Sequence, residues 1–246
     1  GLSEPGLKVL HAPDVDFRSH CNTFAACLRT LGRWSDDNSG HVPVFVLLEL
    51  KTRGLDLFED GATVQPFDRA AFDELDRTIY GVLGRDRVLT PGDVRGDHPT
   101  LNAAVRGGAW PTLAAARGRF LFLLITAGDL ASPADYLSAA GDRGEPAAFV
   151  RARPGEDHAA FLMYDNAIVR EAEIRRRVRD GYLVRTRADI DTWEARQDDP
   201  RRARAALRSG AQIISTDFYR PGNAFGTDYV VTLPGPGVVR RSPAFD

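Results

Sequence analysis

Short apolar runs alternate along the chain with amphipathic stretches, and their order predicts the secondary structure. Read as strands, the apolar runs lie at residues 7–11, 42–50, 119–126, 147–152, 181–186 and 211–217. The amphipathic stretches predict helices at residues 21–34, 68–83, 99–106, 111–117, 133–140, 167–180 and 200–209. Strands that alternate with helices in this way are typical of a parallel sheet covered by helices.

The repeated strand and helix unit favours a TIM-type (β/α)8 barrel. Eight units close a barrel of roughly 250 residues, whereas about six are visible in the 246 residues here, so we expect the first one or two to lie upstream of Gly1. With no low-complexity linker or break in composition, residues 1–246 are expected to form a single barrel domain. An open six-stranded sheet is the alternative, but the sequence lacks the glycine-rich phosphate turn that usually follows its first strand.

Glycine and proline predict where several elements end. Gly181 and Gly210 each directly precede a predicted strand, so we expect them to terminate helices. The tail from Pro221 is rich in both residue types, which predicts an irregular segment with a short hairpin.

Charge and hydropathy exclude several classes of partner. The net charge is -2 and no basic block occurs, which argues against nucleic-acid binding. No run reaches the roughly 18 apolar residues of a membrane-spanning helix. The chain opens on glycine, has Met163 as its only methionine and shows no signal-peptide pattern, so a signal peptide is expected upstream of residue 1.

Cys21 and Cys27 are the only cysteines, six positions apart. This spacing suits no metal tetrad. A short disulfide at the start of a helix and two reduced, packed thiols both fit the sequence. If the disulfide forms, we expect the protein outside the cytosol.

The strand VFVLLELK carries charge at its carboxyl end. Because side chains alternate in a strand, one face is wholly apolar, whereas the other presents Phe45, Leu47, Glu49 and Lys51. Glu49 would then point into the barrel at the strand end where barrel enzymes have their active sites. A metal ion or Lys51 could compensate its charge, and an ion pair that only holds a loop is the alternative.

Three further predicted strands end in polar groups. His11 ends the first, Arg185 points the same way as Arg187 in GYLVRTRAD, and Asp217 ends the last. A histidine, a carboxylate and a guanidinium at one rim suit phosphodiester chemistry. For each residue alone a structural role is the alternative: a hydrogen-bonded histidine, a surface arginine, or an aspartate that caps a turn.

Other catalytic patterns are not found in the sequence. His20, His41, His98 and His158 show no zinc spacing. There is no GxSxG elbow of a serine hydrolase and no GxxxxGK[ST] phosphate loop.

Five ordered motifs carry a resemblance to a known family. They read LKVLHAPDVDFRSHC-x5-C, HVPVFVLLELK, VLTPGDVRGDHPTL with GGAWPTLAAARGRFLF, GYLVRTRADIDTWEAR, and GAQIISTDF. In this order they resemble the bacterial calcium-dependent phosphoinositide phospholipase C family of secreted TIM-barrel phosphodiesterases. The similarity runs from about Lys8 to Tyr229.

The resemblance implies a function and roles for individual residues. His11 matches the second active-site histidine, which assists proton transfer at phosphorus, and Glu49 matches a strand-end calcium ligand. Arg185 and Asp217 fall in matching motifs at the barrel mouth, and with Lys51 they are expected to bind the substrate or its phosphate. The implied reaction is in-line attack of the inositol 2-hydroxyl on the headgroup phosphodiester of a lipid at a membrane surface, with Ca²⁺ as cofactor.

Two features of the family do not occur in this chain. The family begins with a His-Asn-Ser-Tyr-like motif that holds the first histidine and a calcium-ligand asparagine, and a strand with an acidic pair follows it. We expect both upstream of Gly1. Two alternatives stay open: a glycerophosphodiester phosphodiesterase on the same barrel, and a non-catalytic barrel that binds a phosphorylated ligand. The sequence leaves the oligomeric state open.

Overall fold

The chain folds into two compact units in a computed structural model that describes residues 3–51, 57–125, 133–139 and 145–245. Unit 1 comprises Gly1–Asp97 and Trp110–Arg151, and unit 2 comprises His98–Ala109 and Ala152–Asp246. Each unit contains a three-stranded sheet in which all strand pairs are parallel. The predicted α/β class with parallel strands is therefore confirmed.

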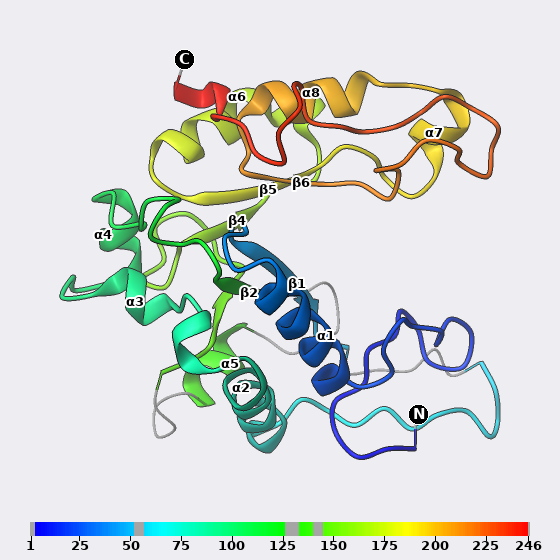
Figure 1. The fold of residues 1–246 in the computed structure, drawn as a ribbon, viewed down its shortest axis with the longest axis vertical. Helices are drawn as coiled ribbons and strands as arrows, with labels where there is room; N and C mark the ends of the chain where they lie inside the picture. Colours follow the sequence, from blue (N-terminus) through cyan, green and yellow to red (C-terminus); the bar gives the residue numbers. More distant parts are fainter. Residues whose placement is uncertain (1–2, 52–56, 126–132, 140–144, 246) are drawn as a thin grey trace. The chain divides into compact units, whose positions relative to one another are not determined.

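Unit 1 has the strand order β1-β2-β3, with helices packed on one face of the sheet (Figure 1). Val44 pairs with Phe120 and Phe122 with Ala148, which sets the register of the three strands. The strands are β1 (Val44–Glu49), β2 (Phe120–Ile125) and β3 (Ala148–Val150). The helices are α1 (Phe24–Asp37), α2 (Arg69–Leu83), the 3-10 turn η1 (Arg85–Arg87), α3 (Pro91–Arg95) and α5 (Pro133–Ala139).

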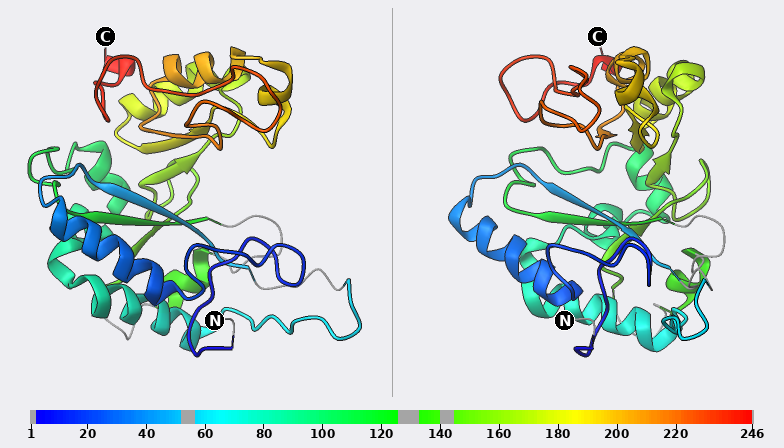
Figure 2. Two further views of the ribbon diagram at one scale, coloured as in Figure 1. Left: turned by 45° about the vertical axis from the view of Figure 1, so that its right-hand side comes forward. Right: turned by 90° about the vertical axis from the view of Figure 1, so that its right-hand side faces the viewer.

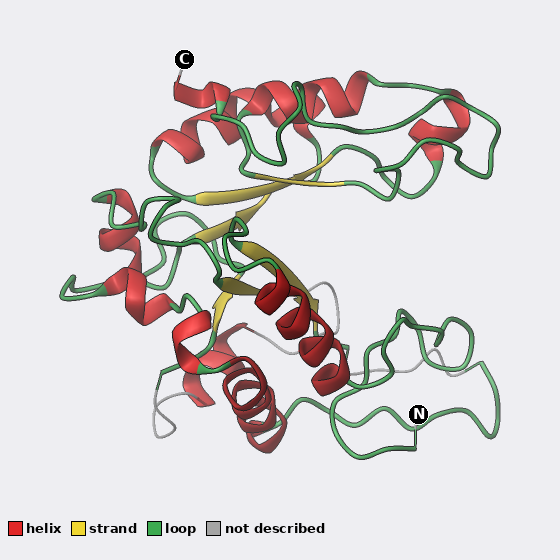
Figure 3. Cartoon of the chain, in the orientation of Figure 1, coloured by secondary structure: helices red, strands yellow, loops and turns green. Residues whose placement is uncertain are grey.

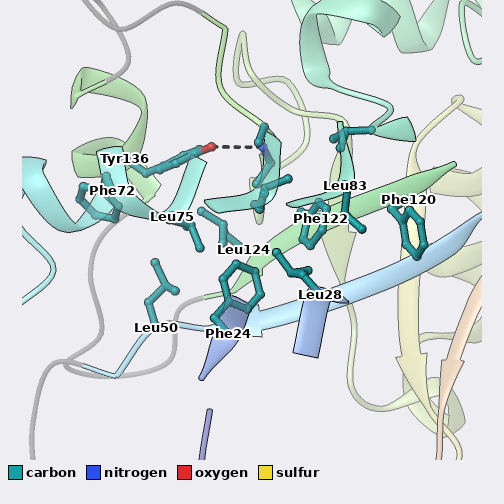
Figure 4. Close-up of a cluster of buried hydrophobic side chains, with 14 of the residues drawn as sticks. Phe24, Leu28, Leu50, Phe72, Leu75, Leu83, Phe120, Phe122, Leu124 and Tyr136 are labelled. Atoms are coloured by element: carbon teal, nitrogen blue, oxygen red, sulfur yellow. Dashed lines mark hydrogen bonds between the residues drawn. The ribbon is translucent and has the colours of Figure 1, made fainter. Parts of the chain in front are cut away.

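Side chains alternate between the two faces of β1, and those of one face contribute to the core of unit 1. Val44, Val46, Leu48 and Leu50 pack against α1 and α2, as the sequence predicts, whereas Phe45, Leu47 and Glu49 are exposed. Figure 4 shows Phe24 and Leu28 of α1 and Leu75 of α2 meeting Phe122 and Leu124. The Tyr136 hydroxyl accepts a hydrogen bond from the Ala148 N–H at 3.1 Å, which ties α5 to β3.

Unit 2 has the strand order β4-β5-β6, and α6 and α8 lie side by side next to β5 (Figure 2). The strands are β4 (Phe161–Met163), β5 (Leu183–Arg187) and β6 (Ile213–Ser215). The helices are α4 (Leu101–Arg106), α6 (Ala167–Arg179), α7 (Trp193–Gln197), α8 (Arg201–Ser209) and the 3-10 turn η3 (Pro243–Phe245).

The two predicted helix-ending glycines are in place. Gly210 is the C-cap of α8 with φ 83°. Gly181, with φ 96°, follows the C-cap of α6, and a Cβ atom there would lie 2.1 Å from the Val105 carbonyl oxygen. Glycine is therefore required at position 181, where the chain turns from α6 into β5 against α4.

The predicted strand at residues 7–11 is wrong. Its backbone bonds to the segment just before α1 instead of joining a sheet: Lys8 bridges Thr23 antiparallel, and the Val9 N–H donates to the Asn22 carbonyl at 3.1 Å. Leu7 and Val9 still pack on the core of unit 1, which explains their apolar alternation. The other five predicted strands occur, and β4 was not predicted.

The helix predictions fail in one place. Where a helix was predicted at residues 111–117, residues 113–118 form turns instead, and Gly118 ends them with φ 73°. The short α3 and α7 were not predicted, although Thr90 makes a capping box with Asp93 at the start of α3. Thr126 and Ala140, at the ends of two predicted elements, lie outside the described residues.

The tail is irregular, as predicted, but the short hairpin is wrong. Figure 3 shows loop along most of residues 216–242, and no strand occurs over residues 221–245. One backbone hydrogen bond, from the Val231 N–H to the Phe218 carbonyl at 2.8 Å, connects the tail to the end of β6. Proline supplies no N–H donor and glycine adds conformational freedom, and both effects disfavour a regular ladder here.

Candidate functional site

A groove of ≈ 1000 Å³ lies in unit 1 beside the carboxyl end of β1. Three segments line it: residues 6–11 with 13, 14 and 17, residues 47–51, and residues 58–67 apart from 59 and 66, together with Phe24 and Leu75. Most of its wall is apolar, and its polar groups include His11, Glu49 and Lys51. A large apolar pocket with a few converging polar groups is the usual form of a ligand site.

Lys51 connects the three predicted site residues of unit 1. Its Nζ donates to the His11 carbonyl oxygen at 2.5 Å and lies 3.6 Å from the Glu49 carboxylate. The side chains of Lys51 and Glu49 are 31% and 38% exposed. The structure therefore brings His11, Glu49 and Lys51 together, even though residue 11 is separated from β1 by a whole helix.

His11 lies in a tight turn, and a carboxylate fixes its ring. The N–H groups of His11 and Ala12 both donate to the Asp16 carbonyl oxygen, at 3.2 and 2.9 Å. His11 Nδ1 lies 2.8 Å from Asp16 Oδ2, and the two side chains are 75% and 59% exposed. With Nδ1–H donating to Asp16, the other ring nitrogen, Nε2, is left to exchange a proton with a ligand.

A second aspartate ties the two loops around the groove. Asp14 adopts φ 66°, and both oxygens of its carboxylate lie 3.0 Å from the Ala62 N–H. A Cβ atom on Gly61 would lie 3.0 Å from the Asp14 carboxylate, so the loop after β1 approaches closely at this point. The hydrogen bonds from Ala62 support the left-handed backbone of Asp14 and connect two of the segments that line the groove.

The described residues do not make a complete calcium site. Calcium takes roughly 6–8 oxygen ligands, and no group of three or more His, Cys, Asp or Glu side chains able to hold a metal occurs in the described part of the chain. Glu49, half-exposed and at a strand end, is suitable as one ligand.

Arg185 and Asp217, the other predicted site residues, belong to unit 2. Arg185 lies on β5 and is 8% exposed. Its Nη1 lies 2.6 Å from Asp165 Oδ1, and its Nε donates to Ser215 Oγ at 2.7 Å. Asp217 follows β6 and is exposed. Thr216, and not Asp217, caps the following turn by accepting the Phe218 N–H at 3.0 Å.

Asp189 is a buried carboxylate next to this strand end. It is 1% exposed and accepts hydrogen bonds from the Thr216 hydroxyl at 2.5 Å and from the Asp217 N–H at 3.2 Å. Burial raises the pKa of Asp189 above its ordinary value, and the two hydrogen bonds counteract that effect in part. Asp189 thus holds the end of β6 to the end of β5.

Sequence reasoning missed Asp16, Asp165 and Asp189. Asp189 could have been found, because it continues the alternation of Arg185 and Arg187 along GYLVRTRAD. Asp16 lies three residues after Pro13, a spacing that is compatible with a turn. The sequence did not show, however, that this turn would bring Asp16 into contact with His11. Asp165 had no signal, since β4, which precedes it, was itself not predicted.

Two further observations bear on where the protein acts. Cys21 and Cys27 form a disulfide with a Cα–Cα distance of 5.3 Å, which decides the alternative that the sequence left open. No helix among the described residues is long and apolar enough to cross a membrane.

Comparison with known proteins identifies the family. The model of the family described as Ca²⁺-dependent phosphoinositide phospholipase C matches residues 1–243. No curated protein matches the chain. The match confirms the family resemblance inferred from the five sequence motifs and the expected class of enzyme. Calcium dependence belongs to the description of the family.

Solved structures support the fold. A Ca²⁺-dependent phosphatidylinositol-specific phospholipase C from Streptomyces antibioticus superimposes with a TM-score of 0.60 at 24% identity, covering 81% of this chain and 72% of that chain. A calcium-dependent enzyme from Pseudomonas sp. gives a TM-score of 0.49 at 18% identity, covering 67% of this chain and 57% of that chain. The Streptomyces match shows a shared α/β fold. By the extent of the family match, the chain belongs to the Ca²⁺-dependent phosphoinositide phospholipase C family.

Proposed function

We propose that this chain acts as a calcium-dependent phosphoric diester hydrolase that cleaves the headgroup phosphodiester of a phosphoinositide. One observation carries the proposal: His11, Glu49 and Lys51 converge on one groove in a member of this family. The family match favours this activity over that of a glycerophosphodiester phosphodiesterase.

The chain's own residues suit the transfer of a phosphoryl group. The inositol 2-hydroxyl attacks phosphorus in line, a new O–P bond forms, and the O–P bond to diacylglycerol breaks. His11 Nε2, with Nδ1 held by Asp16, is placed to pass a proton between the reacting oxygens. Lys51 offers positive charge to the phosphate oxygens. Glu49 is proposed as one ligand of the calcium ion, which would supply positive charge to the phosphate oxygens.

We further propose that residues 1–246 belong to one (β/α)8-type barrel domain with Arg185 and Asp217 in the wall of the headgroup pocket. The parallel strands of both sheets, and polar groups at the carboxyl ends of β1, β5 and β6, support this proposal.

The protein is proposed to be secreted and to work at a membrane surface. The disulfide supports secretion, because disulfides persist in oxidising compartments. Exposed apolar side chains in the two loops around the groove support contact with lipid. They are Val15, Phe17, Leu57 and Phe58, exposed by 48%, 44%, 61% and 57%.

The test is cleavage of phosphatidylinositol in mixed vesicles with phosphatidylcholine, with calcium and with a chelator of calcium. We expect calcium-dependent release of an inositol phosphate and diacylglycerol. Cleavage of glycerophosphoinositol but not of the vesicles would support the glycerophosphodiester alternative. Binding of inositol phosphate without cleavage of either substrate would support the non-catalytic barrel, and both results would contradict the proposed activity.

A further inference from the structure

The groove beside β1 has a deep apolar part that the proposed chemistry does not use. Three of the side chains that line it, Phe24, Leu50 and Leu75, belong to the core of unit 1 and are 5%, 7% and 2% exposed (Figure 4). Four partly buried apolar side chains that pack on this core line the groove as well: Leu7, Val9, Leu48 and Phe67. The groove therefore reaches down to the core, and its apolar walls favour hydrocarbon over a phosphate or a sugar.

The polar groups of the groove lie nearer the solvent than its apolar floor. The side chains of His11, Glu49 and Lys51 are 75%, 38% and 31% exposed. Lys51 is loosely paired, with its Nζ 3.6 Å from the Glu49 carboxylate, so it offers positive charge at the open side of the groove. Charge at the surface and hydrocarbon below it match an amphipathic ligand with an anionic head and an apolar tail.

Two exposed aromatic side chains connect the groove to the surface at which lipid is proposed to bind. Phe17 and Phe58 both line the groove and are 44% and 57% exposed. They belong to the two loops that the hydrogen bonds from the Ala62 N–H to Asp14 hold together. A hydrocarbon chain that moves from a membrane into the groove would stay in contact with apolar side chains, which lowers the free-energy cost of leaving the lipid.

We propose that the apolar part of the groove binds one hydrocarbon chain of the ligand whose phosphate lies near His11 and Lys51. The chemical class of the ligand is a phospholipid held by a single chain. This inference rests on the proposed function in taking the polar side of the groove as the site of reaction. It adds that the protein binds the tail of the lipid, with that chain withdrawn from the bilayer, as well as its phosphate.

The test is calorimetric titration of the full chain with butyl, hexyl and octyl phosphate, each below its critical micelle concentration and in the presence of a calcium chelator. A phosphate monoester offers no diester bond to cleave, so binding is measured without turnover. Each methylene group that enters the groove should tighten binding by up to about fourfold. We expect octyl phosphate to bind at least about tenfold more tightly than butyl phosphate.

Leu47→Ser tests the wall of the groove, and Phe45→Ser is its matched control. Both side chains lie on the same face of β1 and are 37% and 38% exposed, but of the two only Leu47 lines the groove. Leu47→Ser should lower the ratio of octyl to butyl phosphate affinity, whereas Phe45→Ser should keep the wild-type ratio. Phe58→Ser, in the loop after β1, is a second groove variant that leaves the sheet unchanged. Lys51→Gln should weaken all three alkyl phosphates by the same factor, which separates head from tail.

Three results would overturn the inference. They are equal affinity for the three alkyl phosphates, a wild-type ratio of octyl to butyl affinity in both Leu47→Ser and Phe58→Ser, and binding of octyl phosphate only in micelles or vesicles. The last would show that the chain stays in the lipid aggregate. The two proposals fail separately: tight binding of octyl phosphate without cleavage of phosphatidylinositol contradicts the proposed function alone, and cleavage without chain-length dependence of binding contradicts this inference alone.

Discussion

The carboxyl ends of β1 and β5 both carry charged side chains, but the two sets of charges are held differently. At the end of β1, Glu49 and Lys51 are 38% and 31% exposed, 3.6 Å apart, and open to a groove. On β5, the side chain of Arg185 is 10% exposed and lies 2.6 Å from its carboxylate partner.

This difference indicates that the charges at the end of β1 are available to a ligand, whereas Arg185 stabilises the fold. A buried, closely paired charge has its donors occupied and costs free energy when one partner is removed. A loosely paired, half-exposed charge contributes little to folding and stays available to a ligand. We therefore expect substitutions at the end of β1 to reduce activity and substitution of Arg185 to reduce stability.

The largest effect is expected for His11→Ala. Loss of a general acid or base typically lowers the rate by roughly 10²–10⁴-fold, and an exposed side chain should leave the melting temperature unchanged. Cleavage of phosphatidylinositol and thermal unfolding are measured together. His20→Ala is the control, because His20 is exposed in the same segment; equal rates for the two variants would remove His11 from the mechanism.

Arg185→Gln should act on stability. We expect a loss of about 2–3 kcal/mol, between the roughly 3–5 kcal/mol of a fully buried pair and the 0–1 kcal/mol of a surface pair. Urea unfolding measures this change. Arg201→Gln breaks another Arg–Asp pair, whose arginine is 80% exposed, and should have a smaller effect. An Arg185 variant as stable as wild type would contradict the structural role.

Opening the disulfide tests how firmly the His11 segment is held beside β1. Replacing Cys21 and Cys27 by serine should destabilise the fold by about 2 kcal/mol, since the closed loop is short. Thermal unfolding with and without reductant gives the comparison. Reductant should lower the melting temperature of the wild type and leave the double variant unchanged; equal sensitivity of both proteins would show that the disulfide contributes nothing.

The smallest effect concerns a structural ion cluster in unit 1. Burial would raise the pKa of Asp93, but hydrogen bonds from Arg85 and the Thr90 N–H, with the charges of Arg85 and Arg119, lower it to about 2. A lowered pKa stabilises the folded state above the ordinary value of 3.8, and this contribution is lost as the pH falls toward about 2.

Melting temperatures between neutral pH and that acidic limit test this contribution. Asp93→Asn should be less stable than wild type at neutral pH and should approach it in acid. Asp97→Asn, at an exposed position two residues beyond α3, should follow the wild type throughout. A difference in melting temperature between Asp93→Asn and wild type that stays the same at every pH would contradict a stabilising role for the lowered pKa of Asp93.

The sequence predicted the parallel α/β class and the alternation of β1, because Val44 to Leu50 follow a period of two and meet one helix layer. It misassigned residues 7–11, since a locally paired segment that rests on the core shows the same alternation as a strand. It grouped His11 with Glu49 correctly but for the wrong reason: Lys51 and the turn at Asp16 place His11, not a strand. The pairing of Arg185 with Asp165 depends on tertiary packing and has no local signal.

The most direct test of the account is the calcium dependence of phosphatidylinositol cleavage by Glu49→Gln, with Glu59→Gln as the control in the loop after β1. If the end of β1 is the reactive site, Glu49→Gln should require at least about tenfold more free calcium, because it loses a charged ligand, and should melt as the wild type does. Glu59→Gln should match the wild type in both respects. Identical calcium curves for wild type and Glu49→Gln would contradict the central claim.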